Sequence, residues 1–280
     1  MFGNDFNKEK AVNTIGFVGS GNMAEALIKG IISAGVYKPK HIFISDVRLE
    51  RLKQLARKYK VKPVKSNGEL ASKADTVVLS VKPQNMAEVL ESIKGELKKN
   101  ALVISIAAGV KVATIARAIG DFPIIRAMPN TPALIGEGAS ALFANNKARP
   151  KLAAAKSLFT AVGQAVVVAN EKLIDAVTAI SGSGPAYYFL FMEHLIKAAT
   201  KLGLREDVAK SLVLQTAKGA ALLAVEANKN NEDVSELRRK VTSPGGTTEA
   251  ALKVFAQKHI DTIIAEATKA AFKRSQKLSE

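Results

Sequence analysis

The 280 residues of the chain are enough for about two domains, and the balance of 48% hydrophobic and 24% charged residues excludes a disordered or fibrous protein. The lack of cysteine excludes a disulfide framework, a thiolate metal site and a cysteine nucleophile, and it is typical of a cytoplasmic protein. The formal net charge is +16, and most of it lies before residue 170. Such a charge attracts anions, for example a pyrophosphate cofactor, an acidic metabolite or nucleic acid. A lysine-rich surface that only keeps the protein in solution explains the charge equally well.

Short apolar runs alternate with helical patterns through the first 170 residues. The run DTVVLSV is apolar throughout, which is typical of a strand covered on both faces of a sheet. Strands that alternate with helices at this interval indicate parallel βαβ units, so we expect an α/β Rossmann domain with a doubly wound, mostly parallel sheet over residues 1–170. The expected strands are 12–18, 41–45, 61–64, 75–81, 101–106, 122–128 and 164–168, and the expected helices begin at 22 or cover 49–55, 69–71, 85–97, 111–118 and 150–161.

The remaining residues read as helix almost throughout, which predicts an all-α domain over 171–280. The expected helices are 172–181, 185–202, 206–228 and 247–277. They are rich in alanine, which favours a dimer interface, with an intramolecular helical bundle as the alternative. No apolar stretch is long enough for a secretory signal or a membrane span, so we expect neither export nor a membrane.

A glycine-rich turn follows the first expected strand and opens the first expected helix. It reads Gly19-Ser20-Gly21-Asn22-Met23-Ala24. The first glycine permits a tight turn, the second lets the backbone approach a pyrophosphate, and Ala24 is small enough for close packing of the helix. The unpaired N–H groups of the helix N-terminus favour negative charge, so this turn predicts a dinucleotide site.

Further polar residues come at the ends of the neighbouring strands. Asp46 follows the second strand, where an acid accepts hydrogen bonds from the adenine ribose and repels a 2′-phosphate. Ser45, Arg48 and Arg51 lie beside it, and an arginine can instead pair with a 2′-phosphate, so either NADH or NADPH remains open. The segments Ser80-Val81-Lys82-Pro83 and Ala107-Ala108-Gly109 end two more strands at the edge where such sheets bind ligands.

Two glycine-rich segments lie in or next to the helical half. They are SGSGPAY at 181–187 and VTSPGGTT at 241–248. A glycine-rich turn before a helix presents N–H groups and hydroxyls to an anion such as a carboxylate, and an ordinary helix cap explains either segment alone.

Six motifs in this order and spacing resemble pyrroline-5-carboxylate reductase: IGFVGSGNMAEAL, SVKPQ, SIAAG, MPNTP, LIDAVTAISGSGPAY and TSPGGTTEAAL. The resemblance covers nearly the whole chain. It implies reduction of the cyclic imine Δ1-pyrroline-5-carboxylate to L-proline with NADPH or NADH, the last step of proline biosynthesis. It also implies a Rossmann domain followed by a helical dimerisation domain that interlocks two subunits, and dimers that gather into larger rings such as a decamer.

Carried over position by position, the resemblance and the strand ends together give the expected site. The expected cofactor-binding residues are Val18, Gly19, Ser20, Gly21, Asn22, Met23, Ser45, Asp46, Arg48, Asn67, Ser80, Val81, Lys82, Pro83, Ile106, Ala107 and Ala108. The expected substrate-binding residues are Lys82, Glu226, Ser243, Gly246, Thr247 and Thr248, with Thr248 as the catalytic residue. In relatives the position of Asp46 is often a serine or another polar residue, and the stretch between Glu226 and Ser243 is a few residues longer here than in some of them.

The chemistry implied by the resemblance needs no nucleophile, because an iminium carbon is already electrophilic. We expect Ser243 and the backbone N–H groups of Thr247 and Thr248 to bind the substrate carboxylate, and the Thr248 hydroxyl to accept from the ring N–H. Lys82 either assists at that carboxylate or pairs with a cofactor phosphate.

Two rival functions and a metal site are disfavoured. A related imine or 2-hydroxyacid reductase would use the same nucleotide domain, but the SPGGTT segment argues against it. A nucleic-acid-binding protein would need a recognition motif or stacking aromatics, and aromatic residues make up only 5% of the chain, so we expect no nucleic-acid partner. His41, His194 and His259 lack metal-ligand spacing, so no metal is expected.

Overall fold

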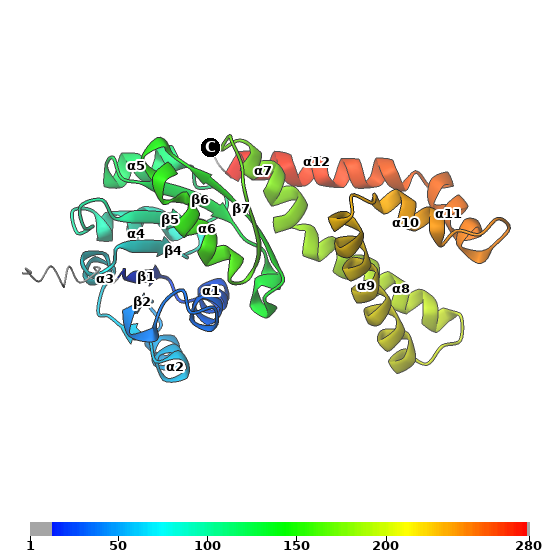
Figure 1. The fold of residues 1–280 in the computed structure, drawn as a ribbon, viewed down its shortest axis with the longest axis horizontal. Coiled ribbons are helices and arrows are strands. Elements are labelled where there is room, and N and C mark those ends of the chain that lie inside the picture. Colours follow the sequence, from blue (N-terminus) through cyan, green and yellow to red (C-terminus); the bar gives the residue numbers. More distant parts are fainter. Residues whose placement is uncertain (1–12, 279–280) are drawn as a thin grey trace, which may run out of the picture. The chain divides into compact units, whose positions relative to one another are not determined.

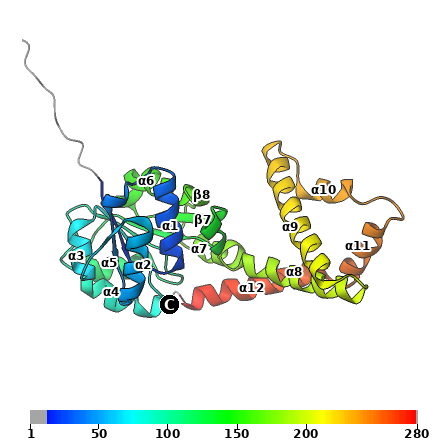
Figure 2. The same ribbon diagram turned by 90° about the horizontal axis from the view of Figure 1, so that it is seen from below.

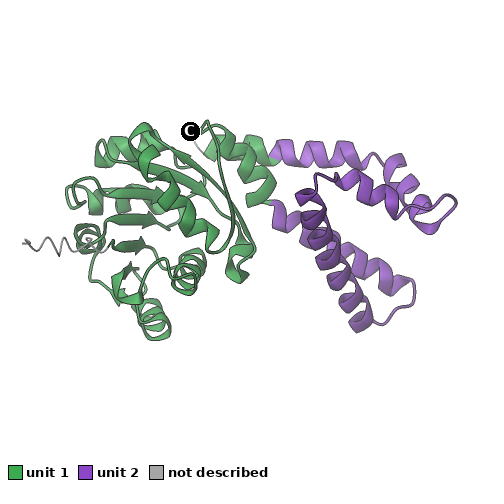
Figure 3. Ribbon diagram, viewed as in Figure 1, with its two compact units in different colours: residues 1–183, 271–280 green, residues 184–270 purple. Residues whose placement is uncertain are grey.

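The computed structural model describes residues 13–278 (Figure 1). The chain divides into two compact units, residues 1–183 with 271–280 and residues 184–270 (Figure 3). This division falls later than the expected boundary at 170, because α7 (Leu173–Val177) packs against strands of the first unit and the chain returns to that unit at its C-terminal end.

The first unit is built on one eight-stranded sheet in the order β3-β2-β1-β4-β5-β6-β7-β8. Every neighbouring pair is parallel except β6 and β7, so the predicted doubly wound, mostly parallel Rossmann fold is confirmed. The strands are β1 (Ile15–Val18), β2 (Ile42–Ser45), β3 (Lys62–Pro63), β4 (Thr76–Leu79), β5 (Leu102–Ser105), β6 (Ile124–Met128), β7 (Gly138–Ala144) and β8 (Gly163–Val167). The strand order reverses between β1 and β4, the place where such sheets bind ligands beyond their carboxyl ends.

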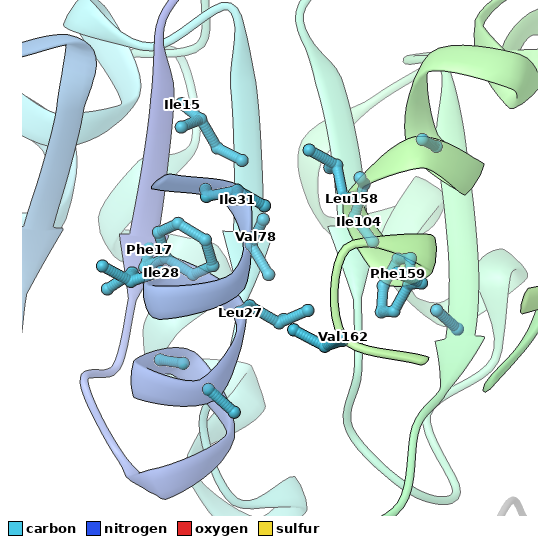
Figure 4. Packing of buried hydrophobic residues seen from close by; sticks show 14 of the residues in the cluster. Ile15, Phe17, Leu27, Ile28, Ile31, Val78, Ile104, Leu158, Phe159 and Val162 are labelled. Atoms are coloured by element: carbon cyan, nitrogen blue, oxygen red, sulfur yellow. The ribbon is translucent and has the colours of Figure 1, made fainter. Parts of the chain in front are cut away.

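Helices cover both faces of this sheet, which is why β1, β4 and β5 are buried along their whole length. One apolar cluster joins a face of the sheet to α1 (Asn22–Ser33), α2 (Leu49–Tyr59) and α6 (Leu152–Thr160). Figure 4 shows Leu27, Ile28 and Ile31 of α1 beside Phe17 and Val78 in this cluster. A second cluster joins the other face to α3 (Asn67–Lys73), α4 (Met86–Ile93) and α5 (Val112–Ile119) (Figure 2).

One strand of the first unit was not expected, and several expected elements are shorter in the structure, such as α4, which ends at Ile93 and not at residue 97. Strand β7, in the segment 136–144 that the sequence left without an assignment, runs antiparallel to β6. Its glycine and alanines carry little of the β-branched and aromatic signal of a strand, so only its pairing with β6 and β8 reveals it. The first strand is observed over Ile15–Val18 rather than 12–18, and residue 12 lies outside the described residues.

The second unit consists of helices. They are α8 (Gly184–Lys201), α9 (Glu206–Lys229), α10 (Val234–Lys240), α11 (Thr247–Gln257) and the first part of α12 (Ile260–Leu278). The expected single helix over 247–277 is wrong, because His259 takes a left-handed φ of 53° and separates α11 from α12. Helix α10 was not expected, and it is short and strongly charged.

Apolar side chains of this second unit are largely exposed. Only Gly184, Ala209 and Ala227 are buried among residues 184–270. Helix α9 is long and apolar enough by composition to cross a membrane, and only 6% of its most apolar window is buried. Large exposed apolar residues on these helices include Phe189, Leu190, Leu222, Leu223, Ile263 and Ile264.

Candidate active site

The turn between β1 and α1, residues Gly19–Met23, is called the glycine loop below. Gly19 has a φ of +86°, and a Cβ there would lie 2.6 Å from the carbonyl oxygen of Ser80. Its N–H donates to the carbonyl oxygen of Ser45 at 2.9 Å. Only glycine combines this backbone conformation with so close an approach to the end of β4, so the loop is fixed against two neighbouring strands.

The N-terminus of α1 is open to a ligand. Gly21 caps the helix without any side-chain hydrogen bond to its first turn, and a Cβ at Gly21 would meet no atom within 4 Å. The first turn of this 12-residue helix therefore lacks a side-chain cap, and its N–H groups lie at the positive end of the helix dipole. This arrangement fits the pyrophosphate of a dinucleotide, and Gly21 leaves the room that its backbone approach requires.

Asp46 is built into this loop from the end of β2. Its Oδ2 accepts a hydrogen bond from the Ser20 N–H at 2.8 Å, and its Oδ1 accepts from the Arg48 N–H at 2.9 Å. The Arg48 side chain holds the same carboxylate in a bidentate pair, from Nε at 3.0 Å and from Nη2 at 3.1 Å. Burial alone would raise the pKa of Asp46, but the hydrogen bonds from Arg48 and Ser20 outweigh it and hold this pKa below its usual value.

The second arginine near this site, Arg51, is tied to the protein itself. Its Nε donates to the carbonyl oxygen of Ser20 at 2.8 Å, and its Nη2 pairs with Glu25. Lys58 and Tyr59 each donate to Glu25 Oε1 at 2.9 Å. Burial opposes ionisation of Glu25, yet the three donors lower its pKa to about 2. No local pattern reveals the role of Glu25, because that role depends on side chains from α2.

Other expected cofactor residues lie at the same edge of the sheet. Ser45 Oγ donates to Asn67 Oδ1 at 2.8 Å, which joins the end of β2 to the start of α3. The Ser80 N–H donates to Val18 O at 2.8 Å and the Ile106 N–H to Leu79 O at 3.1 Å, which aligns the ends of β1, β4 and β5. Lys82 follows β4, and its exposed side chain makes no ion pair or hydrogen bond in the described part of the chain.

A buried charged group, not found from the sequence, lies under this edge. Arg126 of β6 is 2% exposed, and its guanidinium pairs with Glu171 at 3.3 Å and with Asp175 at 3.6 Å. Ser275, near the end of α12, donates to Asp175 Oδ1 at 2.8 Å. The last turn of α12 also reaches the turn after β5, since a Cβ at Gly109 would lie 2.5 Å from Leu278 O. The C-terminal end is thereby fixed to the first unit.

The MPNTP and SGSGPAY segments meet within the first unit. Asn130 Nδ2 donates to Ser181 O at 3.0 Å, and its Oδ1 accepts from the Ala139 N–H at 2.8 Å. Residues Thr178–Gly182 form a π-helical turn, a rare geometry that often occurs at functional sites. Asn130 thus holds this turn against the start of β7.

The segment Ser243–Thr248, called the threonine loop below, precedes α11 in the second unit. Gly245 has a φ of +69°, and Gly246 caps the helix without a side-chain hydrogen bond. The Gly246 N–H donates to Ser243 O at 3.0 Å, and the Gly245 N–H donates to Glu249 Oε2 at 2.7 Å. The hydroxyls of Ser243, Thr247 and Thr248 have no partner within the described residues. The threonine loop therefore brings uncapped first-turn N–H groups and three hydroxyls without a partner among the described residues into one short segment, and these are the groups that bind an anion.

The remaining expectations concern Glu226 and the binding of a metal ion. Glu226 lies on α9, where it forms a surface pair with Lys229 at 2.7 Å, and no hydrogen bond or ion pair joins it to the threonine loop among the described residues. Its part in substrate binding stays a prediction. Among residues 13–278 no group of acidic or histidine side chains could hold a metal ion.

Comparison with known proteins gives concordant relatives. Residues 171–278 match the family model described as pyrroline-5-carboxylate reductase dimerisation, and residues 14–109 match that of NADP oxidoreductase coenzyme F420-dependent. A pyrroline-5-carboxylate reductase of Pseudomonas aeruginosa is 44% identical over 95% of this chain and 97% of its own length.

Two solved structures are also similar along nearly the whole chain. A pyrroline-5-carboxylate reductase from Coxiella burnetii has a TM-score of 0.90 at 40% identity, covering 96% of this chain and 99% of that one. A Plasmodium falciparum pyrroline carboxylate reductase with NADP bound has a TM-score of 0.83 at 32% identity, covering 96% of this chain and 98% of that one.

Proposed function

The chain belongs to the pyrroline-5-carboxylate reductase family, and from that premise we propose how its residues divide the work of the reaction. It is an NAD(P)H-dependent oxidoreductase that reduces Δ1-pyrroline-5-carboxylate to L-proline, the last step of proline biosynthesis. The reduced nicotinamide supplies the hydride when it is bound. Because the protonated imine carbon is already electrophilic, the residues of the chain need only bind and orient the reactants.

The glycine loop holds the cofactor in this proposal. The free first-turn N–H groups of α1 bind the pyrophosphate, with Gly19 and Gly21 giving the backbone its close approach. The adenosine would lie against the end of β2 and the start of α3, at Ser45, Asp46, Arg48 and Asn67. The nicotinamide half would lie along the ends of β4 and β5, at Ser80–Pro83 and Ile106–Ala108.

The threonine loop holds the substrate, and its geometry is the observation that carries the proposal. Ser243 and the N–H groups of Thr247 and Thr248 bind the carboxylate, since Gly246 leaves the first turn of α11 without a side-chain cap. Thr248 is half-buried and its hydroxyl has no partner among residues 13–278, so it is available to accept from the ring N–H. The negative charge of Glu249 does not oppose this role, because its carboxylate accepts the Gly245 N–H and lies 3.5 Å from Lys253.

Lys82 and Glu226 take secondary positions in the proposal. The ammonium of Lys82 after β4 is exposed and has no ion pair with any described residue, and in the proposal it binds either a cofactor phosphate or the substrate carboxylate. A Lys82→Met variant separates the two roles, since the KM of the affected reactant rises more than that of the other. Glu226 assists at the substrate only if Glu226→Gln raises the KM for pyrroline-5-carboxylate.

The assembly we propose is a homodimer in the cytoplasm, with a ring of dimers such as a decamer as the higher assembly. The match of residues 171–278 to a dimerisation model and the exposed apolar residues of α8 and α9 support the dimer. A second copy, and not lipid, covers α9 in this proposal, because α9 carries charged residues along its length, among them Lys210, Lys218 and Glu226. Light scattering of purified protein without detergent tests the assembly.

The activity and the role of Thr248 are tested together. Purified protein is mixed with pyrroline-5-carboxylate and either NADH or NADPH, and the loss of reduced-nicotinamide absorbance is followed. Thr248→Ala should lower kcat by about ten- to a thousandfold, as expected for the loss of one positioned polar contact, and Thr248→Ser should restore most of it. Thr200→Ala is the matched control, because the Thr200 hydroxyl donates to its own helix at Ile196 O. Unchanged kcat and KM in Thr248→Ala would remove Thr248 from the mechanism.

A further inference from the structure

The carboxylate of Asp46 is held against Ser20 of the glycine loop. Its side chain is 6% exposed, and its Oδ2 accepts the Ser20 N–H at 2.8 Å. Ser20 is itself fully buried and bonded through its Oγ to Ser45 O at 3.2 Å. An acid in this position of a Rossmann fold lies beside the adenine ribose, so its negative charge is fixed where a 2′-substituent of the cofactor comes to lie.

Only one of the donors to Asp46 can leave. The Ser20 and Arg48 N–H groups belong to the backbone, whereas the guanidinium of Arg48 is on a side chain that is 61% exposed. Ribose hydroxyls can replace this guanidinium as donors to the carboxylate, and Arg48 can then move into solvent without leaving an unpaired buried charge.

Arg51 is not available to a 2′-phosphate. Its Nε, Nη1 and Nη2 are occupied by Ser20 O, Gln54 and Glu25, and its side chain is 15% exposed. Glu25 neutralises the charge of Arg51 and is itself held by Lys58 and Tyr59. Recruiting Arg51 to a phosphate would leave the carboxylate of Glu25 without its closest cation.

From this arrangement we propose that Asp46 makes the enzyme prefer NADH over NADPH, with Arg48 as the one arginine that permits residual use of NADPH. The inference rests on the proposed function of the glycine loop and names the cofactor of that site. A 2′-phosphate brings up to two negative charges beside the fixed carboxylate, and it gains Arg48 only by breaking the Arg48–Asp46 pair. A 2′-hydroxyl meets no such opposition. We expect the Kd of NAD⁺ to be lower than the Kd of NADP⁺ by about tenfold or more.

The same chain contains a matched control at the opposite edge of the sheet. Asp75 precedes β4, its Oδ2 accepts the Thr14 N–H at 2.9 Å, and its Oδ1 pairs with Lys98 at 3.0 Å. Asp75 thus shares with Asp46 a backbone N–H donor and a surface cation, but it lies away from the glycine loop. Its replacement removes a similar carboxylate without touching the cofactor site.

Isothermal titration of the full-length protein with NAD⁺ and with NADP⁺ measures the preference without catalysis. Asp46→Asn keeps an oxygen that can accept from Ser20 but removes the charge, so the ratio of the two Kd values should shift by about tenfold or more toward NADP⁺. Arg48→Gln should shift it in the other direction, because the 2′-phosphate loses the one arginine beside Asp46 that can turn toward it. Asp75→Asn should leave the ratio at the wild-type value.

Two results would overturn the inference: tighter binding of NADP⁺ by the wild type, or an unchanged ratio in Asp46→Asn that remains folded by circular dichroism. If Asp46→Asn fails to fold, an unchanged ratio in Arg48→Gln decides against the inference in the same way. Absence of pyrroline-5-carboxylate reduction with both cofactors, alongside a clear NAD⁺ preference in titration, would refute the proposed function and support the role of Asp46.

Discussion

The two units of the chain bury their apolar residues to very different extents. The Rossmann unit encloses two clusters that cover both faces of its sheet, and residues such as Ile15, Ile44 and Leu79 are fully buried. The helical unit, residues 184–270, buries only a glycine and two alanines, while Leu222 and Leu223 of α9 are each 56% exposed. An exposed apolar surface of this kind marks an interaction site, so we expect the stability of the second unit, unlike that of the first, to depend on another copy of the chain.

The largest effect should follow from breaking that dependence. Leu223→Glu places a charge on the exposed apolar face of α9, where association would bury it without a partner. We expect dissociation to monomers in analytical ultracentrifugation and a loss of activity of about a hundredfold or more. Val36→Glu in the first unit is the control, because Val36 lies exposed after α1 and outside both apolar clusters. A Leu223→Glu variant that stays assembled and active would show that the α9 face is not the interface.

Next in size is the loss of the buried charge in the Rossmann unit. Arg126→Gln leaves Glu171 and Asp175 without their cation under the sheet edge, so it should lower the free energy of unfolding by about 3 to 5 kcal/mol. Urea unfolding measures the change at a fixed protein concentration. Arg205→Gln in the helical unit removes an exposed pair with Asp207 and should leave the unfolding midpoint unchanged. Equal shifts in the two variants would contradict the difference between the units.

Two leucines, one in each unit, test the same difference in burial. Leu27→Ala in α1 removes a side chain that is 2% exposed, and it should cost about 2 to 5 kcal/mol at every protein concentration. Leu222 is 56% exposed and we expect a second copy to bury it, so the cost of Leu222→Ala should depend on protein concentration and vanish in dilute samples. Thermal unfolding at several concentrations separates the two cases. A concentration-independent cost for Leu222→Ala would mean that its partner lies within the same chain.

Much of the first unit could be predicted from the sequence because its signals are local. The apolar runs of β1, β4 and β5 and the spacing of Gly19 and Gly21 each report directly on burial and backbone conformation. The expected cofactor residues lie at the ends of neighbouring strands, and parallel strands end at one edge of the sheet. Correct strand assignments were therefore sufficient to predict that these residues lie close together.

What could not be predicted depends on contacts between distant segments. The cluster of Arg126, Asp175 and Ser275 joins β6, α7 and the end of α12, and nothing local marks these residues as partners. The break at His259 has no proline or glycine to announce it, so helical periodicity alone predicted one long helix. The substrate residues were predicted from the resemblance, and the unpaired first turn of α11 is what the structure adds to them.

The smallest expected effect concerns the ion cluster around Glu25, and it depends on pH. The folded protein holds the pKa of Glu25 at about 2, below its ordinary value of 4.5, so the carboxylate binds protons more weakly in the folded than in the unfolded chain. Its contribution to stability is therefore complete above pH 4.5 and is lost as the pH falls from 4.5 toward 2. At neutral pH, Glu25→Gln should lower the free energy of unfolding by about 1 to 3 kcal/mol, and the difference from wild type should close over that acid range. Glu193→Gln removes an exposed pair with Lys197 on α8, so its urea midpoint should equal that of the wild type both at neutral pH and at pH 2. A Glu25→Gln deficit that persisted unchanged at pH 2 would show that shape, and not charge, is what Glu25 contributes beside Arg51.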